Sequence, residues 1–147
     1  IETDDTPLYS AVLSELAEAE IATGRASDAE PLCHELVAYC AKPFTKAPGV
    51  SGRAQRILAV SLLRQGKPAE AADLLAAALP AITEQYGADH WHTAFTQVLL
   101  NAAHDNPGAA DQQQFMEAEA EKVKAQQDAI PIGQRAWVLA QVAACLR

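Results

Sequence analysis

Two histidines and an aspartate lie close together in the segment YGADHWHTA, residues 86–94. Imidazole and carboxylate groups bind zinc and also transfer protons, so Asp89, His90 and His92 are the first candidates for chemistry. A zinc site needs three or four converging ligands, and the two remaining histidines lie in different predicted hairpins. Side chains two positions apart are also not expected to share a helix face. We therefore expect a structural role, in which Asp89 or His90 caps a helix beginning at Trp91, with a metal-dependent enzyme as the remote alternative.

Other arrangements that could perform catalysis are missing from the sequence. There is no glycine-rich phosphate loop, no GxSxG, no HExxH and no CxxC pair. Cys33 and Cys40 lie seven positions apart in a predicted helix, which separates their Cα atoms by about 10 Å and prevents a disulfide. The alternating Glu and Lys residues of segment 117–124 are typical of a solvated helix face. We expect no enzyme activity, no cofactor and no metal.

Composition narrows the class of protein. The 147 residues are 50% hydrophobic but only 5% aromatic, and alanine, the best helix former, is abundant. The 11 Lys and Arg residues against 19 Asp and Glu give a net charge of −8, which disfavours nucleic-acid binding. No apolar run is long enough to cross a membrane. The three cysteines, expected as buried thiols, suit a reducing compartment, so the cytoplasm is favoured while the localisation stays open.

The sequence repeats itself with a period of 42 residues. Segment 16–36 aligns with segment 58–78, so that Gly24 falls on Gly66, and a further step of 42 reaches Gly108. Repeats of this length indicate a stack of similar helical units. We interpret the chain as one domain with units at 7–48, 49–90 and 91–132 and a final helix at 133–147. Because it starts with Ile and ends inside a predicted helix, we interpret it as part of a longer protein.

Each unit is predicted to be a pair of helices joined at a glycine. Gly66 can adopt the left-handed conformation that ends a helix, and Pro68 suits the first turn of the next one. Thr6 and Pro7 make a similar helix start near the N-terminus. Apolar residues spaced by three and four support helices, and no strand-like alternation occurs. The expected helices cover residues 7–23, 26–42, 51–65, 68–86, 91–105, 108–128 and 133–147.

The segments GRASDAEPL and GKPAEAADLL resemble the turn and second helix of the tetratricopeptide repeat. The 42-residue period, with Tyr-Gly-x-Asp-His closing a unit, is similar to the long variant in kinesin light chains and in bacterial proteins, including C-terminal arrays of bacterial serine/threonine kinases. The resemblance implies an all-α, right-handed superhelical solenoid of about seven helices. It is weaker in the third unit, at Asn101 and Gln113. The final helix either caps the stack or belongs to a longer array.

The resemblance also implies a concave groove lined by the first helix of each unit. The groove residues that we single out are Arg53, Arg56, Val60, Arg64, Phe95, Val98 and Trp137. Arg53 and Arg56 would pair with acidic groups of an extended or helical peptide, while Phe95 and Trp137 would bury an apolar anchor. In the alternative interpretation, these arginines are solvated or pair with Glu15 and Glu18. The Lys and Asn residues that clamp peptide C-termini in some such repeats are absent, since Glu18 stands at one Asn position.

These observations favour a non-catalytic module for protein–protein interaction and signalling. The expected role is a regulatory or scaffolding segment of a larger protein, with a bacterial kinase as one candidate parent. The expected partner is a protein or an acidic peptide, or another domain of the parent chain, and neither nucleic acid nor membrane insertion is expected. The alternative is a structural element that packs permanently inside a larger assembly. Fold alone does not choose between them.

Overall fold

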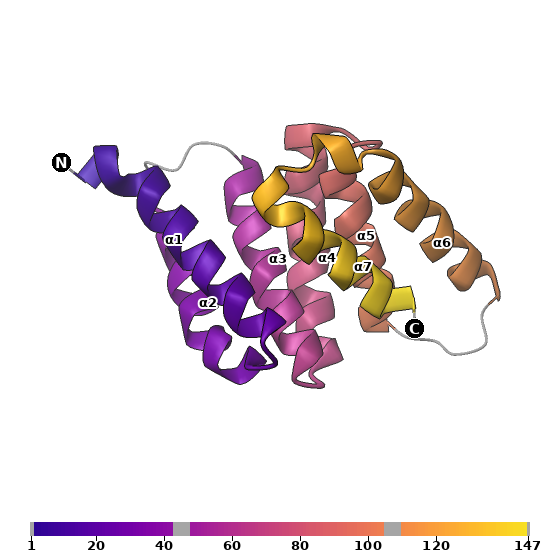
Figure 1. Cartoon of the computed structure of the whole chain (residues 1–147), viewed down its shortest axis with the longest axis horizontal. Coiled ribbons are helices and arrows are strands. Elements are labelled where there is room, and N and C mark those ends of the chain that lie inside the picture. Colours follow the sequence, from indigo (N-terminus) through magenta and orange to yellow (C-terminus); the bar gives the residue numbers. More distant parts are fainter. Residues whose placement is uncertain (1, 43–47, 105–109, 147) are drawn as a thin grey trace.

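A computed structural model describes residues 2–42, 48–104 and 110–146, with the side chains of 2–7, 48–49 and 110–112 left out. All regular structure in these ranges is helical, which confirms the predicted class (Figure 1). The α-helices are α1 (Glu2–Ala22), α2 (Ala26–Cys40), α3 (Pro48–Arg64), α4 (Pro68–Tyr86), α5 (Trp91–His104), α6 (Ala110–Ala125) and α7 (Ile132–Leu146). A short 3-10 helix, η1 (Gln127–Ala129), precedes α7.

The α1–α2 and α3–α4 turns share one backbone geometry, as the repeat predicts. Gly24 and Gly66 have positive φ angles of 81° and 76°, which place them in the left-handed region that glycine tolerates. The amide after each glycine closes the turn: Arg25 donates to the Glu20 carbonyl at 2.8 Å, and Lys67 donates to the Leu62 carbonyl at 2.9 Å. Both are the long hydrogen bond of a Schellman ending, and the two bonds are 42 residues apart. The third predicted turn, at Gly108, lies outside the described residues.

Three predicted helix ends are wrong. Helix α1 begins at Glu2 and includes Pro7, and α3 begins at Pro48, three residues earlier than expected. Acidic side chains stabilise the positive N-terminal end of a helix, and three of the first four residues of α1 are acidic, namely Glu2, Asp4 and Asp5. At the other end of the chain α6 stops at Ala125 instead of 128, because the backbone tightens into η1 there.

Each helix packs on the next one along the chain, and alternate helices also touch. Helix α3 contacts α1 as well as α2 and α4, and α5 contacts α3, α4 and α6. Small residues permit the close approach: Ala17, Ala59 and Ala71 are fully buried. At Gly52 an added Cβ would lie 2.9 Å from Cγ1 of Ile82 on α4. The helices therefore form neighbouring hairpins around a continuous core of aliphatic side chains.

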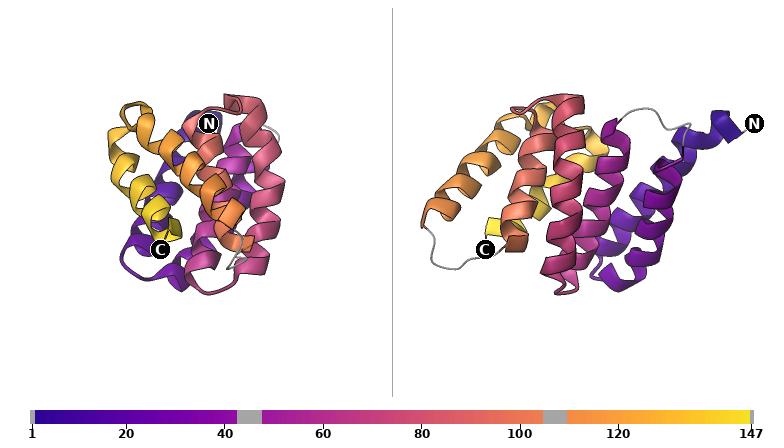
Figure 2. Two further views of the ribbon diagram at one scale, coloured as in Figure 1. Left: turned by 90° about the vertical axis from the view of Figure 1, so that its right-hand side faces the viewer. Right: turned by 180° about the vertical axis from the view of Figure 1, so that it is seen from behind.

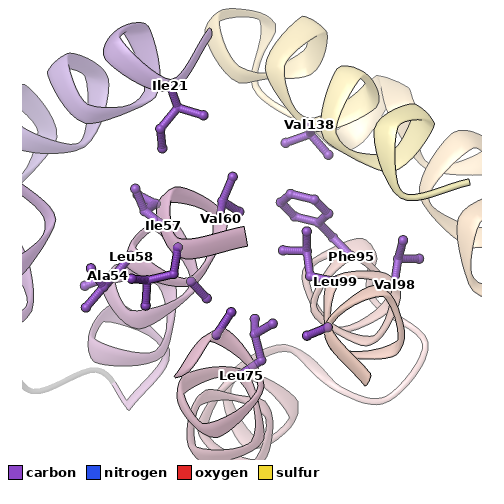
Figure 3. Packing of buried hydrophobic residues seen from close by; sticks show 14 of the residues in the cluster. Ile21, Ala54, Ile57, Leu58, Val60, Leu75, Phe95, Val98, Leu99 and Val138 are labelled. Carbon is purple, nitrogen blue, oxygen red and sulfur yellow. The ribbon is translucent and has the colours of Figure 1, made fainter. Parts of the chain in front are cut away.

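Helix α7 lies on the side of α3 and α5 that faces away from α4 (Figure 2). It packs against α5 and, less extensively, against α6. A hydrogen bond also joins it to α3, because Nε of Arg64 donates to Oε1 of Gln141 at 3.0 Å. Figure 3 shows Val138 of α7 and Ile21 of α1 on the same side of the core, above Val60 and Phe95. The final predicted helix therefore covers much of the face that the sequence assigned to an open groove.

Candidate functional site

A cleft of about 450 Å³ lies between α1 and α7, with α3 as its floor. Figure 3 shows the α1 and α7 ribbons at opposite upper sides of the buried core. One wall carries serine and glutamate side chains from α1, and the opposite wall carries glutamine, tryptophan and valine from α7. The lining residues are Ser10, Ala11, Ser14, Glu15, Glu18, Leu36, Cys40, Val50, Arg53, Ala54, Arg56, Ile57, His92, Gln134, Trp137 and Val138.

Arg56 is the most buried charged residue of the cleft, with 5% of its surface exposed. Its Nη1 donates to the His92 carbonyl at 3.0 Å and to Oγ1 of Thr96 at 3.2 Å. Its Nη2 lies 3.0 Å from Nδ1 of His92. Because a guanidinium can only donate, Nδ1 of His92 is the acceptor and its proton is on Nε2. The guanidinium therefore joins α3 to the first turns of α5.

The protonation states around Arg56 follow from burial. Burial and the nearby Arg53 lower the pKa of Arg56 to about 9, so its guanidinium is charged at neutral pH. Burial, together with the Arg56 and Arg53 charges, lowers the pKa of His92 to about 2. His92 is therefore a neutral acceptor throughout the physiological range, and the positive charge of this cluster resides on the two arginines.

Glu18 places a carboxyl group on the α1 wall of the same cleft. It is buried, with 9% of its surface exposed, and within the described residues no hydrogen bond or ion pair reaches it. Burial raises the pKa of Glu18 to about 7, although the Arg56 charge acts in the opposite direction. The hydrogen bonds of Arg56 go to α5, and among the described side chains it forms no ion pair with Glu15 or Glu18, the partners of the alternative interpretation.

Two N–H donors at the cleft have no acceptor in the described part of the chain. They are Nε of Arg56 and Nε1 of Trp137, and both atoms are buried. The two side chains meet at Phe95: the guanidinium carbon of Arg56 lies 4.7 Å from the ring centroid, and the Trp137 ring packs edge-on at 6.0 Å. A buried donor without an acceptor costs about 1–3 kcal/mol. An acceptor group that entered the cleft and reached these donors would offset that cost.

The structure separates the predicted groove residues into two groups. Arg53, Arg56 and Trp137 line the cleft, and Arg53 also lies over the Tyr86 ring at 6.0 Å. The second group lies outside it. Val60, Phe95 and Val98 are fully buried in the core beneath α7, and Arg64 is exposed beside Gln141. A partner would reach Val60 or Val98 only if α7 moved.

The histidine segment forms the start of α5. His90 is the N-cap, because its Nδ1 accepts from the His92 amide at 3.1 Å, and Thr93 Oγ1 donates to the Gly87 carbonyl at 2.7 Å. The expected separation of the histidines was wrong: their rings stack at 5.4 Å, because His90 lies outside the helix and its ring folds back. Trp91 is buried and stacks on His92 at 3.7 Å. This segment therefore caps the N-terminus of α5 and packs its aromatic rings against one another.

Several partners of these residues were not predicted from sequence. Thr96 and His92 bind Arg56 across 40 and 36 positions, and nothing in the local pattern indicates that pairing. The role of Gln126 was not predicted either. Its Oε1 accepts from the Trp91 amide at 2.9 Å, and its Nε2 donates to the Asp89 carbonyl at 2.7 Å. Its position just after α6 was a weak signal, since glutamine there can cap the neighbouring helix.

Comparison with protein-family models and with curated proteins matches the chain to no family and to no relative. Within residues 2–42, 48–104 and 110–146 no three His, Cys, Asp or Glu side chains are grouped so that they could hold a metal ion. In the same ranges no helix combines the length and apolar character needed to cross a membrane. The cleft between α1, α3 and α7 is the site on which a functional proposal can be based.

Proposed function

We propose that the chain is a non-catalytic interaction module whose cleft binds an extended acidic segment of a protein partner. We further propose that its helix hairpins stack as in a tetratricopeptide-like solenoid, with α7 folded onto the inner face. Arg53 and Arg56 supply positive charge at the cleft floor, although the chain as a whole carries a net charge of −8. The two arginines therefore attract an acidic group to the cleft floor, although Glu15 and Glu18 of the α1 wall oppose this attraction.

The buried, unpaired Nε of Arg56 is the observation that carries this proposal. Within the described residues Arg56 uses three of its five N–H groups to hold α5, so its Nε–H and one N–H of Nη2 remain for a ligand. The unpaired Nε1 of Trp137 provides a second donor from α7. A carboxylate has two oxygens and accepts from two donors at once, and charge-assisted hydrogen bonds of this kind are the strong ones.

The size of the cleft suits a short segment of a partner chain. The cleft measures about 450 Å³, which is within the range of pockets that hold a compact ligand. Apolar floor residues Val50, Ala54 and Ile57 can contact aliphatic side chains of the segment. Acidic residues alternating with aliphatic ones fit this lining.

Binding of a five-residue peptide of alternating glutamate and leucine, with blocked ends, tests the proposal. Calorimetry should show binding that Arg53→Gln weakens by at least about tenfold, which corresponds to about 1.4 kcal/mol. Arg25→Gln is the matched control, because Arg25 is exposed at the α1–α2 turn and its ion pair is with Glu20. Equal losses in the two variants, or equal binding of the glutamine version of the peptide, would overturn the proposal.

An exposed apolar stripe on α1 favours a second candidate function, that of a permanent structural element. Leu8, Val12 and Leu16 follow one another at spacings of four and are 66%, 52% and 46% exposed. A surface of this kind is more typical of a lasting contact than of an exchangeable one. Purification of the chain in a complex that survives dilution to nanomolar concentration, with this stripe protected from solvent, would support the second candidate.

A further inference from the structure

Glu18 is a carboxyl group in a position where a second negative charge would be unfavourable. It lines the cleft from α1, and it has neither a hydrogen bond nor an ion pair within the described residues. The proposed ligand also brings a carboxylate into this volume of about 450 Å³. Two carboxylates that share a small site cannot both remain ionised without a large energetic cost, whereas a carboxyl–carboxylate pair can share one proton.

We propose that Glu18 makes ligand binding in the cleft proton-dependent, because the bound carboxylate shares the proton of a neutral Glu18 while it pairs with the arginines. This inference rests on the proposed function and adds its regulation. The proton balance is simple. When Glu18 is already neutral, binding takes up no proton, and when Glu18 is ionised, each binding event takes one proton from solvent.

The groups that surround Glu18 are consistent with this assignment. Its own helix contributes Glu15, and α2 contributes Cys33, whose thiol pKa is raised to about 12 by burial together with the charges of Glu30 and Glu18. Helix α3 contributes Arg53 and Arg56, and α5 contributes His92, which is neutral. From α7 the cleft receives Gln134, Trp137 and Val138, which carry no charge. The arginines attract both carboxylates, and Glu18 is the buried acid among these groups.

The pH range of the effect follows from the groups involved. Burial raises the pKa of Glu18 to about 7, so the side chain changes charge near neutrality. Glutamates of an exposed peptide have a pKa of about 4.3 and stay ionised from pH 5.5 to 8.5. His92 stays neutral throughout that interval, and Arg56, whose pKa is lowered to about 9, keeps most of its charge up to pH 8.5. Affinity for the acidic peptide should therefore be constant below about pH 6 and decrease by up to about tenfold for each pH unit above about 7.

Titration of the glutamate–leucine peptide at several pH values between 5.5 and 8.5 tests the inference. The natural chain should bind less tightly as the pH rises, and Glu18→Gln should bind with an affinity that changes by less than about twofold over the interval. Glu84→Gln is the matched control, since Glu84 is an exposed glutamate of α4 that does not line the cleft. It should keep the pH dependence of the natural chain.

A second measurement does not depend on any variant. Calorimetry of the natural chain at pH 8, in two buffers with different ionisation enthalpies, should show uptake of about one proton per peptide, and uptake should approach zero at pH 5.5. Binding that is tight but independent of pH, or a Glu18→Gln variant with the dependence of the natural chain, would overturn this inference alone. Absence of peptide binding at pH 5.5 would overturn the proposed function with it.

Discussion

Burial disfavours the charged forms of both Glu18 and His92, yet the two residues change stability with pH in opposite directions. The pKa of Glu18 is raised from 4.5 to about 7, so the folded chain keeps a proton that the unfolded chain releases. Stability contributed by Glu18 is therefore lost as the pH rises from about 4.5 to 7. The pKa of His92 is lowered from 6.5 to about 2, so stability is lost as the pH falls below 6.5. Between 4.5 and 6.5 the two effects largely cancel in the natural chain.

Glu18→Gln should remove one of these two effects. The pKa of Glu18 lies about 2.5 above its ordinary value, which corresponds to about 3 kcal/mol at about 1.4 kcal/mol per pKa unit. We expect the variant and the natural chain to be similarly stable at pH 4 and the variant to be more stable by up to about 3 kcal/mol at pH 8. Urea unfolding at a series of pH values measures the difference. A difference that does not change with pH would mean that Glu18 is solvated in the folded state.

The resemblance placed Arg56 in the expected groove and Glu18 at a position where some such repeats carry Asn, but it could not give the charge states of these two residues. Their protonation depends on how much protein covers them, and that cover includes α7. The same limit applies to His92, whose role as an acceptor for Arg56 depends on a contact across 36 residues.

At the scale of single helices the sequence was informative because its signals are local. Glycine in the left-handed region and proline in a first turn act within a few residues, so the α1–α2 and α3–α4 turns were predictable from Gly24, Gly66 and Pro68. Helix beginnings at Ala26, Pro68 and Ala110 recur with the 42-residue period. The start of α1 was not predictable, because Thr6 and Pro7 make a good helix start that the acidic residues before them displace by five positions.

The close contact of α3 with α4 at Gly52 leads to a prediction about helix packing. Gly52→Ala would place a Cβ 2.9 Å from Cγ1 of Ile82 and 3.1 Å from the Ala78 carbonyl oxygen. Overpacking typically costs about 1–3 kcal/mol, and it should outweigh the gain of up to about 1 kcal/mol that alanine brings to a helix. We expect the variant to unfold at lower urea concentration than the natural chain.

Two further variants control the Gly52 prediction. Gly133→Ala makes the same change in α7, where an added Cβ meets nothing within 4 Å, so stability should be unchanged or slightly higher. In an Ile82→Ala background, Gly52→Ala should cost less than it does alone, because Cγ1 is absent. If Gly52→Ala were as well tolerated as Gly133→Ala, the two helices would be farther apart than described.

At the scale of the whole molecule, the position of α7 was the main feature that the sequence did not reveal. An apolar stripe on the last helix fits equally well against a neighbouring unit or against the inner face of the stack. Val138 and Val142 are buried, and Trp137 reaches Phe95, so α7 uses this stripe to cover α5. The repeat gives the order of the helices, but it does not specify where a final helix without a following partner will lie.

Helix α7 should open more readily than the helices that it covers. Three of its 15 residues are buried, against nine of 14 in α5, and segments with little buried surface open at low free energy. Native-state hydrogen exchange should show the α7 amides opening at least about tenfold more often than those of α5, a difference of about 1.4 kcal/mol. Exchange of α7 only through global unfolding would contradict this.

The peptide should change this exchange pattern in the helices that form the cleft. Since α1 and α7 form the two walls of the cleft, the glutamate–leucine peptide should slow exchange in α7 and α1, while α6, which does not line the cleft, should be unaffected. Equal slowing in α6 would indicate general stabilisation and would place the peptide elsewhere.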